Sequence, residues 1–299
     1  DTRVPFITAE EMLAYNEGKN LSLWQLAARY ESMRGNISEE EVFSKMNEIR
    51  ILIRDAVETG LKGTEFEDRI LGPQSVKFKA MMEDKKLVDG DVLNRIIMYV
   101  SAIMEVKSAM GVIVAAPTAG SCGAMPGAVL GVADALGLSE EETVKALLIA
   151  GLIGVFIAAH ATFAAEVGGC QAECGAGATM AAAALVYLGG GTLPQSLSAA
   201  SMALQSSLGL ICDPIGNRVE APCLNRNVMA ASNALSCANM ALADYDHLIP
   251  LDEVIETMYE VGKSIPNTLR CTNLGGLSIT KTAKEIEQRL AQKQFFKSC

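Results

Sequence analysis

The chain of 299 residues has few aromatic side chains and few histidines. Aromatic residues make up 5% of it, with one tryptophan, and there are two histidines. Its core must therefore be filled by Leu, Ile, Val, Met and Ala, and an apolar fraction of 50% is large enough to fill one. We expect a folded globular protein in which most of the chain is ordered.

The chain also lacks a concentrated basic face. It has 25 Lys and Arg against 35 Asp and Glu, which gives a net charge of −10. Because phosphate binding needs clustered positive charge, nucleic acid is not expected as a partner.

The cysteines lack the pattern of a disulfide framework. There are eight, at irregular spacings, in a chain much longer than the small secreted domains that use such frameworks, and no signal-peptide pattern precedes them. We predict free thiols in a reducing compartment, the cytoplasm.

No stretch shows the sustained alternation of a β-strand. Apolar residues recur at helical spacing instead, and the sequence predicts an all-α fold with one large domain over residues 1–299. Residues 1–111 form its amphipathic helical part, and residues 112–299, rich in Ala, Gly, Met and Leu, form a core of closely packed helices. Helices are expected at residues 91–109, 124–136, 179–188, 194–210, 228–243, 251–263 and 280–291, with further helices starting after Ser38 and Ser139.

One run, residues 146–165, has no charged side chain and is long enough to span a bilayer. It contains Gly151, Gly154, His160 and Thr162, however, and no basic cluster or aromatic belt flanks it. We predict a buried central helix and no membrane association.

Three cysteines stand where glycine or proline interrupts regular structure. Cys170 follows two glycines, Cys212 precedes Asp213-Pro214, and Cys223 follows Pro222. Each thiol can therefore leave a helix end and point into a common cavity. Their separations of 42 and 11 residues are unlike the close pairs of a zinc ribbon. Three thiolates can hold a metal cluster and leave one corner open for chemistry.

Such a set of thiolates needs a cation. A thiol with a pKa near 8.5 costs about 2 kcal/mol to ionise at neutral pH, and three converging thiolates repel one another. Metal ligation contributes roughly 10 to 16 kcal/mol in structural sites and offsets that cost.

The sequence around these cysteines resembles the iron–sulfur-dependent L-serine dehydratases, specifically the alpha subunit of the two-subunit form. Several ordered blocks carry the resemblance over most of the chain. They are residues 116–120 (Ala-Pro-Thr-Ala-Gly), 168–173 (Gly-Gly-Cys-Gln-Ala-Glu), 212–214 (Cys-Asp-Pro), 222–227 with Pro222, Cys223, Arg226 and Asn227, 258–263 and 275–277 (Gly-Gly-Leu).

The resemblance implies an all-helical catalytic domain that binds a [4Fe-4S] cluster through Cys170, Cys212 and Cys223. The unligated iron acts as a Lewis acid on the hydroxyl of L-serine, and a base removes the Cα proton. Loss of water then leads to pyruvate and ammonia without pyridoxal phosphate. Amino-acid catabolism feeding gluconeogenesis is the implied setting. A separate beta subunit is the implied partner, since no such domain precedes or follows the helices here.

The loop at residues 118–123 leads into a helix, and helix N-termini favour anions. We assign it the substrate carboxylate, with Thr118 and Ser121 as hydroxyl donors and Gly120 in the loop backbone. Arg226, Lys263 and Arg270 are alternative anion partners.

His160 is a candidate proton shuttle because its unperturbed pKa is near neutrality, and a core histidine is the alternative. Cys174, one helical turn after Cys170, and Cys299, on the C-terminal tail, are possible fourth ligands.

The chain departs from the family pattern in three places. It has His-Ala-Thr-Phe-Ala-Ala at residues 160–165 where the family usually has Asn-Ala-Ser-Ile-Ser-Gly, Cys174 in place of valine and Cys271 in place of glutamate. The change at residues 160–165 removes small polar side chains that the family usually has there. If their hydroxyl groups line the substrate pocket, the substrate differs, and L-cysteine is the alternative amino acid. A non-catalytic scaffold with zinc on Cys170, Cys174, Cys212 and Cys223 is the alternative from another class of protein.

Overall fold

The computed structural model describes residues 3–297, and this part of the chain contains helices and a single isolated β-bridge but no strand. The helices are α1 (Ala9–Asn16), α2 (Leu23–Gly35), α3 (Glu39–Leu61), α4 (Ser75–Glu83), α5 (Asp91–Ser108), α6 (Ala124–Ala135), α7 (Glu140–His160), α8 (Ala165–Gly168), α9 (Cys174–Leu188), α10 (Leu193–Gln205), α11 (Cys223–Leu242), α12 (Leu251–Ser264) and α13 (Lys281–Lys297). Short 3-10 turns are η1 (Ala119–Ser121), η2 (Cys170–Ala172), η3 (Ile215–Asn217), η4 (Asn267–Leu269) and η5 (Gly276–Ile279). The prediction of an all-α fold is confirmed.

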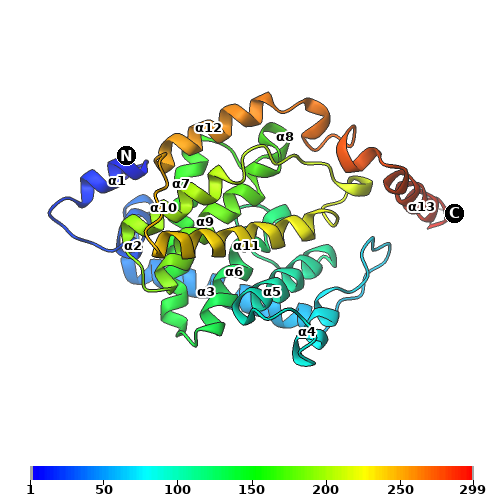
Figure 1. The fold of residues 1–299 in the computed structure, drawn as a ribbon, viewed down its shortest axis with the longest axis horizontal. Coiled ribbons are helices and arrows are strands. Elements are labelled where there is room, and N and C mark those ends of the chain that lie inside the picture. Colours follow the sequence, from blue (N-terminus) through cyan, green and yellow to red (C-terminus); the bar gives the residue numbers. More distant parts are fainter. Residues whose placement is uncertain (1–2, 298–299) are drawn as a thin grey trace.

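Helix α9 is the centre of the fold (Figure 1). It packs against α6, α7, α10 and α11, and every residue of it except Tyr187 is buried. Its sequence is dominated by alanine and glycine, so neighbouring helices can approach it from all sides. A helix that is apolar all round is stable in water only when it is buried in this way.

Helix α7 was predicted to be the buried central helix, and the structure corrects this in part. It packs against α2, α3, α6, α9 and α12, but α9 is more completely enclosed. It ends at His160 rather than at residue 165, and residues 158–160 are exposed. Within residues 3–297 it is the one helix long and apolar enough to cross a membrane, and 67% of that window is buried inside the protein. Burial against five helices accounts for its composition.

Two helices begin five residues earlier than predicted. Helix α9 begins at Cys174 and α11 at Cys223. The glycines at the start of α9 allow close packing, since a Cβ on Gly175 would lie 3.0 Å from Ser207 Cβ. This difference places two cysteines at helix starts.

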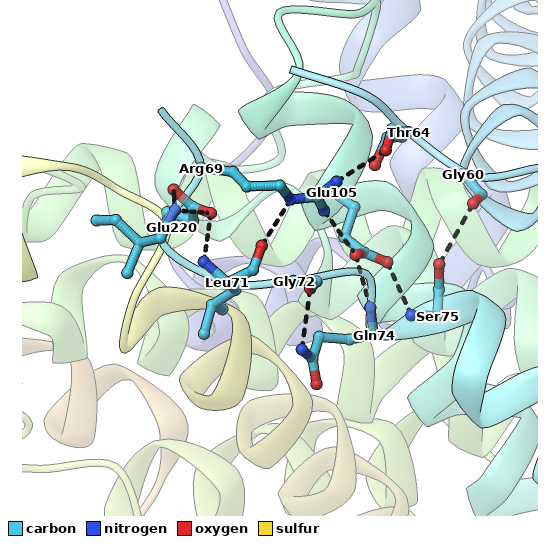
Figure 2. Close-up of polar contacts among 10 residues, drawn as sticks. Gly60, Thr64, Arg69, Leu71, Gly72, Gln74, Ser75, Glu105 and Glu220 are labelled. Carbon is cyan, nitrogen blue, oxygen red and sulfur yellow. Dashed lines mark hydrogen bonds and ion pairs between the residues drawn. The ribbon is translucent and has the colours of Figure 1, made fainter. Parts of the chain in front are cut away.

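A segment between α3 and α4 is held by two buried carboxylates (Figure 2). Glu105, on α5, accepts hydrogen bonds from the backbone N–H groups of Gln74 and Ser75, both at 2.8 Å, and so caps α4. Arg69 Nη2 lies 3.4 Å from the same carboxylate. A carboxylate at a helix start satisfies free donors and complements the helix dipole.

The second carboxylate belongs to Glu220, and it accepts N–H groups of Ile70 and Leu71, each at 2.9 Å. Figure 2 shows Glu220 reaching this segment from a different part of the chain than Glu105. Because Glu220 precedes Cys223 by three residues, the N-terminal part of the chain fixes the turn that carries this cysteine.

Helices α5 and α6 touch along glycines. Gly123, Gly127 and Gly131 stand every fourth residue and face α5. A Cβ on Gly127 would lie 2.6 Å from Val100 Cγ2 and 2.9 Å from Val100 Cα. These backbones approach as the small-residue composition predicted.

We expect Gly127→Ala to lower the free energy of unfolding by about 1 to 3 kcal/mol, because the new methyl group overpacks the contact with Val100. The matched control is Gly151→Ala in α7, where the nearest atom, Met46 Cε, is 4.0 Å away. Removing that helix-interior glycine should stabilise the protein by up to about 1 kcal/mol. Urea denaturation of both variants measures the two effects, and equal values would contradict the packing argument.

Candidate functional site

Three segments carrying the predicted cysteines meet beside the start of α9. Cys170 opens η2, Cys212 forms the β-bridge with Arg270, and Cys223 is the first residue of α11. They are close enough that the charge of Cys170 raises the pKa of Cys212 and of Cys223. The structure therefore brings the three thiols to one region, while their role as ligands stays a prediction.

Gly169 allows the first two cysteine segments to pair. Its φ of +72° suits glycine, and a Cβ there would lie 2.7 Å from Leu210 O. Gln171 N donates to that same carbonyl at 3.1 Å. The Gln171 side chain is fully buried and accepts from Gly209 N while donating to Met258 O. Cys170 is thus fixed against the segment that leads to Cys212.

Asp213 joins the second and third segments. Its buried carboxylate accepts hydrogen bonds from Arg226 Nη1 and from Leu277 N, the latter at 2.6 Å. Burial opposes the charge of Arg226, but the bond to Asp213 raises the pKa of its guanidinium. Arg226 also donates to Ile211 O at 3.1 Å. These contacts give Arg226 a positioning role, and its contact with substrate stays a prediction.

Asn227 closes the predicted anion site. Its Oδ1 accepts the N–H groups of Gly123 at 3.2 Å and Ala124 at 3.1 Å, and its Nδ2 donates to the carbonyls of Gly120 at 2.9 Å and Cys223 at 2.8 Å. The side chain is fully buried and uses all four hydrogen bonds. Two donors at the start of α6, expected to bind the substrate carboxylate, are therefore already used.

Thr118 and Ser121 lie together in the loop before α6. Their hydroxyl oxygens are 2.9 Å apart, and Ser121 is fully buried, so its side chain shapes the loop. Thr118 also donates to Glu173 Oε2. Gly120 has no space for a side chain, since a Cβ would lie 2.7 Å from that same carboxylate oxygen. Whether Thr118 and Ser121 contact substrate stays a prediction.

Glu173 is a site residue that we did not single out from sequence. Burial raises the pKa of its carboxyl group, against the bond from Thr118. Its charge acts on all three predicted ligands, Cys170, Cys212 and Cys223. The signal was present in the block at residues 168–173, whose last residue it is, but nothing local showed that it turns toward Thr118.

The thiols differ in acidity. A hydrogen bond from Cys174 lowers the pKa of Cys170 despite its burial, while the pKa of Cys174 is raised by the same contact. Burial raises the pKa of Cys223 to about 12, and burial together with a bond to Cys271 raises that of Cys212. At neutral pH, Cys212 and Cys223 become thiolates only with a cation nearby. Three soft sulfur donors, of which Cys170 is buried and Cys212 and Cys223 are partly buried, suit iron–sulfur ligation.

A single ion is a poorer match. Within residues 3–297, no group of three or more His, Cys, Asp or Glu side chains is close enough to hold one metal ion. A zinc scaffold on four cysteines would need such a group. An iron–sulfur cluster takes one thiolate per iron, so its ligands stand farther apart.

The remaining candidates lie in other contacts. Lys263 is exposed, with Nζ 2.7 Å from Glu260 Oε1. His160 is exposed too, and its Nε2 is 3.1 Å from Ile7 O, so it is not the core histidine considered as an alternative. Its role as a proton shuttle stays a prediction. Cys299 lies outside the described residues.

The sequence of the chain matches a known protein family. Residues 18–278 match the family model described as serine dehydratase alpha chain, and the chain belongs to that family. It is 37% identical to the "Probable L-serine dehydratase, alpha chain" of Bacillus subtilis (strain 168), covering 95% of each chain. It is 36% identical to the L-serine dehydratase alpha chain of Peptoniphilus asaccharolyticus, covering 94% of this chain and 97% of the relative. It is also 34% identical to the L-serine dehydratase TdcG of Escherichia coli (strain K12), covering 93% of this chain and 63% of that one.

We expect Asn227→Asp to destabilise the protein by about 3 kcal/mol, because a carboxylate oxygen would face the carbonyls of Gly120 and Cys223 where an amide now donates. Asn225→Asp, on the exposed side of α11, is the control and should be neutral. Thermal unfolding measures both, and a neutral Asn227→Asp variant would contradict the assigned bonds.

Proposed function

We propose that this protein is an L-serine dehydratase, which converts L-serine to pyruvate and ammonia. The observation that carries the proposal is the meeting of Cys170, Cys212 and Cys223 around Glu173 and Thr118. Membership of the serine dehydratase alpha chain family and the names of its relatives support the same reaction.

Cys170, Cys212 and Cys223 would hold a [4Fe-4S] cluster. The chemistry of three soft donors in one buried region supports this, and the bound group would supply a Lewis acid for the substrate hydroxyl. Burial raises the pKa of Cys223 and the bond from Cys174 lowers that of Cys170, and the positive charge of Arg226 favours the thiolate form of both. Through Asp213 it also keeps the segment of Cys212 in place.

Glu173 is the proton acceptor in this proposal. It is a carboxylate within the cysteine region, and the Thr118 hydroxyl fixes one of its oxygens, Oε2. Gly120 packs closely against the same oxygen, since a Cβ there would lie 2.7 Å from it. A positioned carboxylate can remove the Cα proton of an amino acid, and Thr118 orients it for that purpose.

L-Cysteine is the alternative substrate, with sulfide as the leaving group. Two departures from the family pattern favour L-cysteine, at residues 160–165 and at Cys271. The Cys271 thiol is hydrogen-bonded to the thiol of Cys212, and both cysteines are free. Turnover on serine, threonine and cysteine distinguishes the two readings.

A beta chain is the proposed partner. Two relatives are named alpha chains, and the match to the Escherichia coli enzyme spans 63% of that longer chain. The beta chain would complete the enzyme in the cytoplasm. Full serine turnover by the purified chain alone would contradict this part of the proposal.

Anaerobic loading with iron and sulfide tests the proposed centre. The loaded protein should be brown, contain acid-labile sulfide, and release pyruvate and ammonia from L-serine in a reaction that fades in air. Cys170→Ser, Cys212→Ser and Cys223→Ser should each lose most of the iron and the activity. Cys237→Ala, at a buried thiol that bonds Asn233, is the control that keeps both.

Iron content and turnover can fail separately. If the protein is colourless, holds one zinc tightly and has no lyase activity, the dehydratase proposal is wrong and the zinc-scaffold hypothesis is favoured. A loaded protein that acts on cysteine but not serine would keep the centre and change the substrate.

We expect Glu173→Gln to lower kcat by a factor of roughly 10² to 10⁴ with iron content unchanged, because the amide cannot accept the proton. Glu166→Gln is the matched control and should keep kcat close to that of the wild type. Glu166 is an exposed carboxylate whose charge acts on Glu173. Steady-state kinetics with an iron assay measures the effect. A Glu173→Gln variant with normal kcat would rule out this carboxylate as the base.

A further inference from the structure

Lys107, on the last turn of α5, has a buried ammonium group without a hydrogen-bond partner in the part of the chain that is described. Its Nζ has almost no exposed surface. A buried charge without partners is costly in a folded protein, so a buried group of this kind calls for an explanation. The C-terminal position on the helix favours a cation there, but its dipole alone does not form the missing hydrogen bonds.

The surroundings of Lys107 are those of the candidate site. Its charge interacts with Cys122, Cys223, Glu173 and Glu220, and although burial lowers its pKa, these neighbours act to raise it. Both Glu220 oxygens bind backbone N–H groups, and Thr118 donates to Glu173 Oε2. Neither carboxylate bonds to Lys107 itself. The N–H groups of the Lys107 ammonium are therefore free to donate hydrogen bonds to an anion bound in the site.

The other cations near the site are already engaged. Arg226 bonds Asp213 and Ile211, and Lys263 is an exposed partner of Glu260. Arg270 donates to Val167 O at 3.3 Å, so its guanidinium has one partner although its Nε has none within residues 3–297. Lys107 has no partner in that part of the chain, and its charge acts on Glu173. Asn227 occupies two of the donors at the start of α6. Among these cations, Lys107 is therefore the one whose charged group has no hydrogen-bond partner among the described residues.

We propose that the Lys107 ammonium binds the α-carboxylate of the amino-acid substrate. The inference rests on the proposed function, and it replaces the start of α6 as the carboxylate site. In this proposal Lys107, on the last turn of α5, holds the carboxylate, and Glu173, directly before α9, accepts the Cα proton. Lys107 thereby selects amino acids with a free carboxylate.

Kinetics on the iron-loaded protein, with its beta chain, test the proposal through Lys107→Met, in which an apolar chain of similar length replaces the ammonium. We expect KM for L-serine to rise roughly 10- to 100-fold, with kcat changed much less, because a charge-assisted hydrogen bond is lost. Activity on L-serinamide, which lacks the carboxylate, should be the same in both proteins. Lys107→Arg should recover part of the affinity.

Equilibrium binding gives a readout apart from turnover. L-Alanine has the same carboxylate but no leaving group, and an NMR titration should show binding to the loaded wild type and none to Lys107→Met. Thermal stability should not fall, since no protein group loses a hydrogen bond. The control is Lys45→Met on α3, which removes an exposed ammonium and should leave KM unchanged.

An unchanged KM with unchanged L-alanine binding would overturn the proposal. So would loss of iron from Lys107→Met, since the lysine would then serve the metal centre instead of the substrate. If Lys107→Met does not fold, Lys107→Gln is measured in the same way. A wild type that binds L-alanine through Lys107 but does not turn over serine would refute the proposed function and leave the anion site standing.

Discussion

The site depends on the buried pair of Asp213 and Arg226. Asp213 follows Cys212, and Arg226 lies one turn after Cys223, so their bond fixes two of the three cysteine segments to each other. Asp213 also accepts the N–H of Leu277, which anchors the residues before α13. Removing one partner of a buried pair typically costs about 3 to 5 kcal/mol, because the other charge is left unpaired. The spacing of the thiols thus depends on an ion pair that is not itself a ligand.

Much of this architecture could be predicted from local sequence. Glycine and proline marked the places where Cys170, Cys212 and Cys223 leave regular structure, and helical spacing without strand alternation indicated the all-α fold. The small-residue composition also indicated close helix contacts, as found between α5 and α6. These features are local in the chain, which is why periodicity and turn chemistry reveal them.

The partners of polar side chains could not be predicted in the same way. Asn227 caps a helix more than 100 residues earlier in the chain, and Glu173 bonds Thr118 across 55 positions. No spacing rule links such residues. The start of α6 seemed to be free for an anion because its cap comes from α11. Lys107 was not singled out from the sequence, because the groups around it belong to other segments.

Helix α9, which begins beside the candidate site, is almost completely buried. It begins directly after Glu173, and nearly all of it is enclosed by four other helices. Backbone amides in such a helix exchange with solvent only when the whole domain opens, whereas surface helices open locally at much lower free energy. Glu173, the proposed proton acceptor, is therefore attached to a helix that we expect to exchange slowly. The position of Glu173 is thereby tied to the most completely enclosed helix among the described residues.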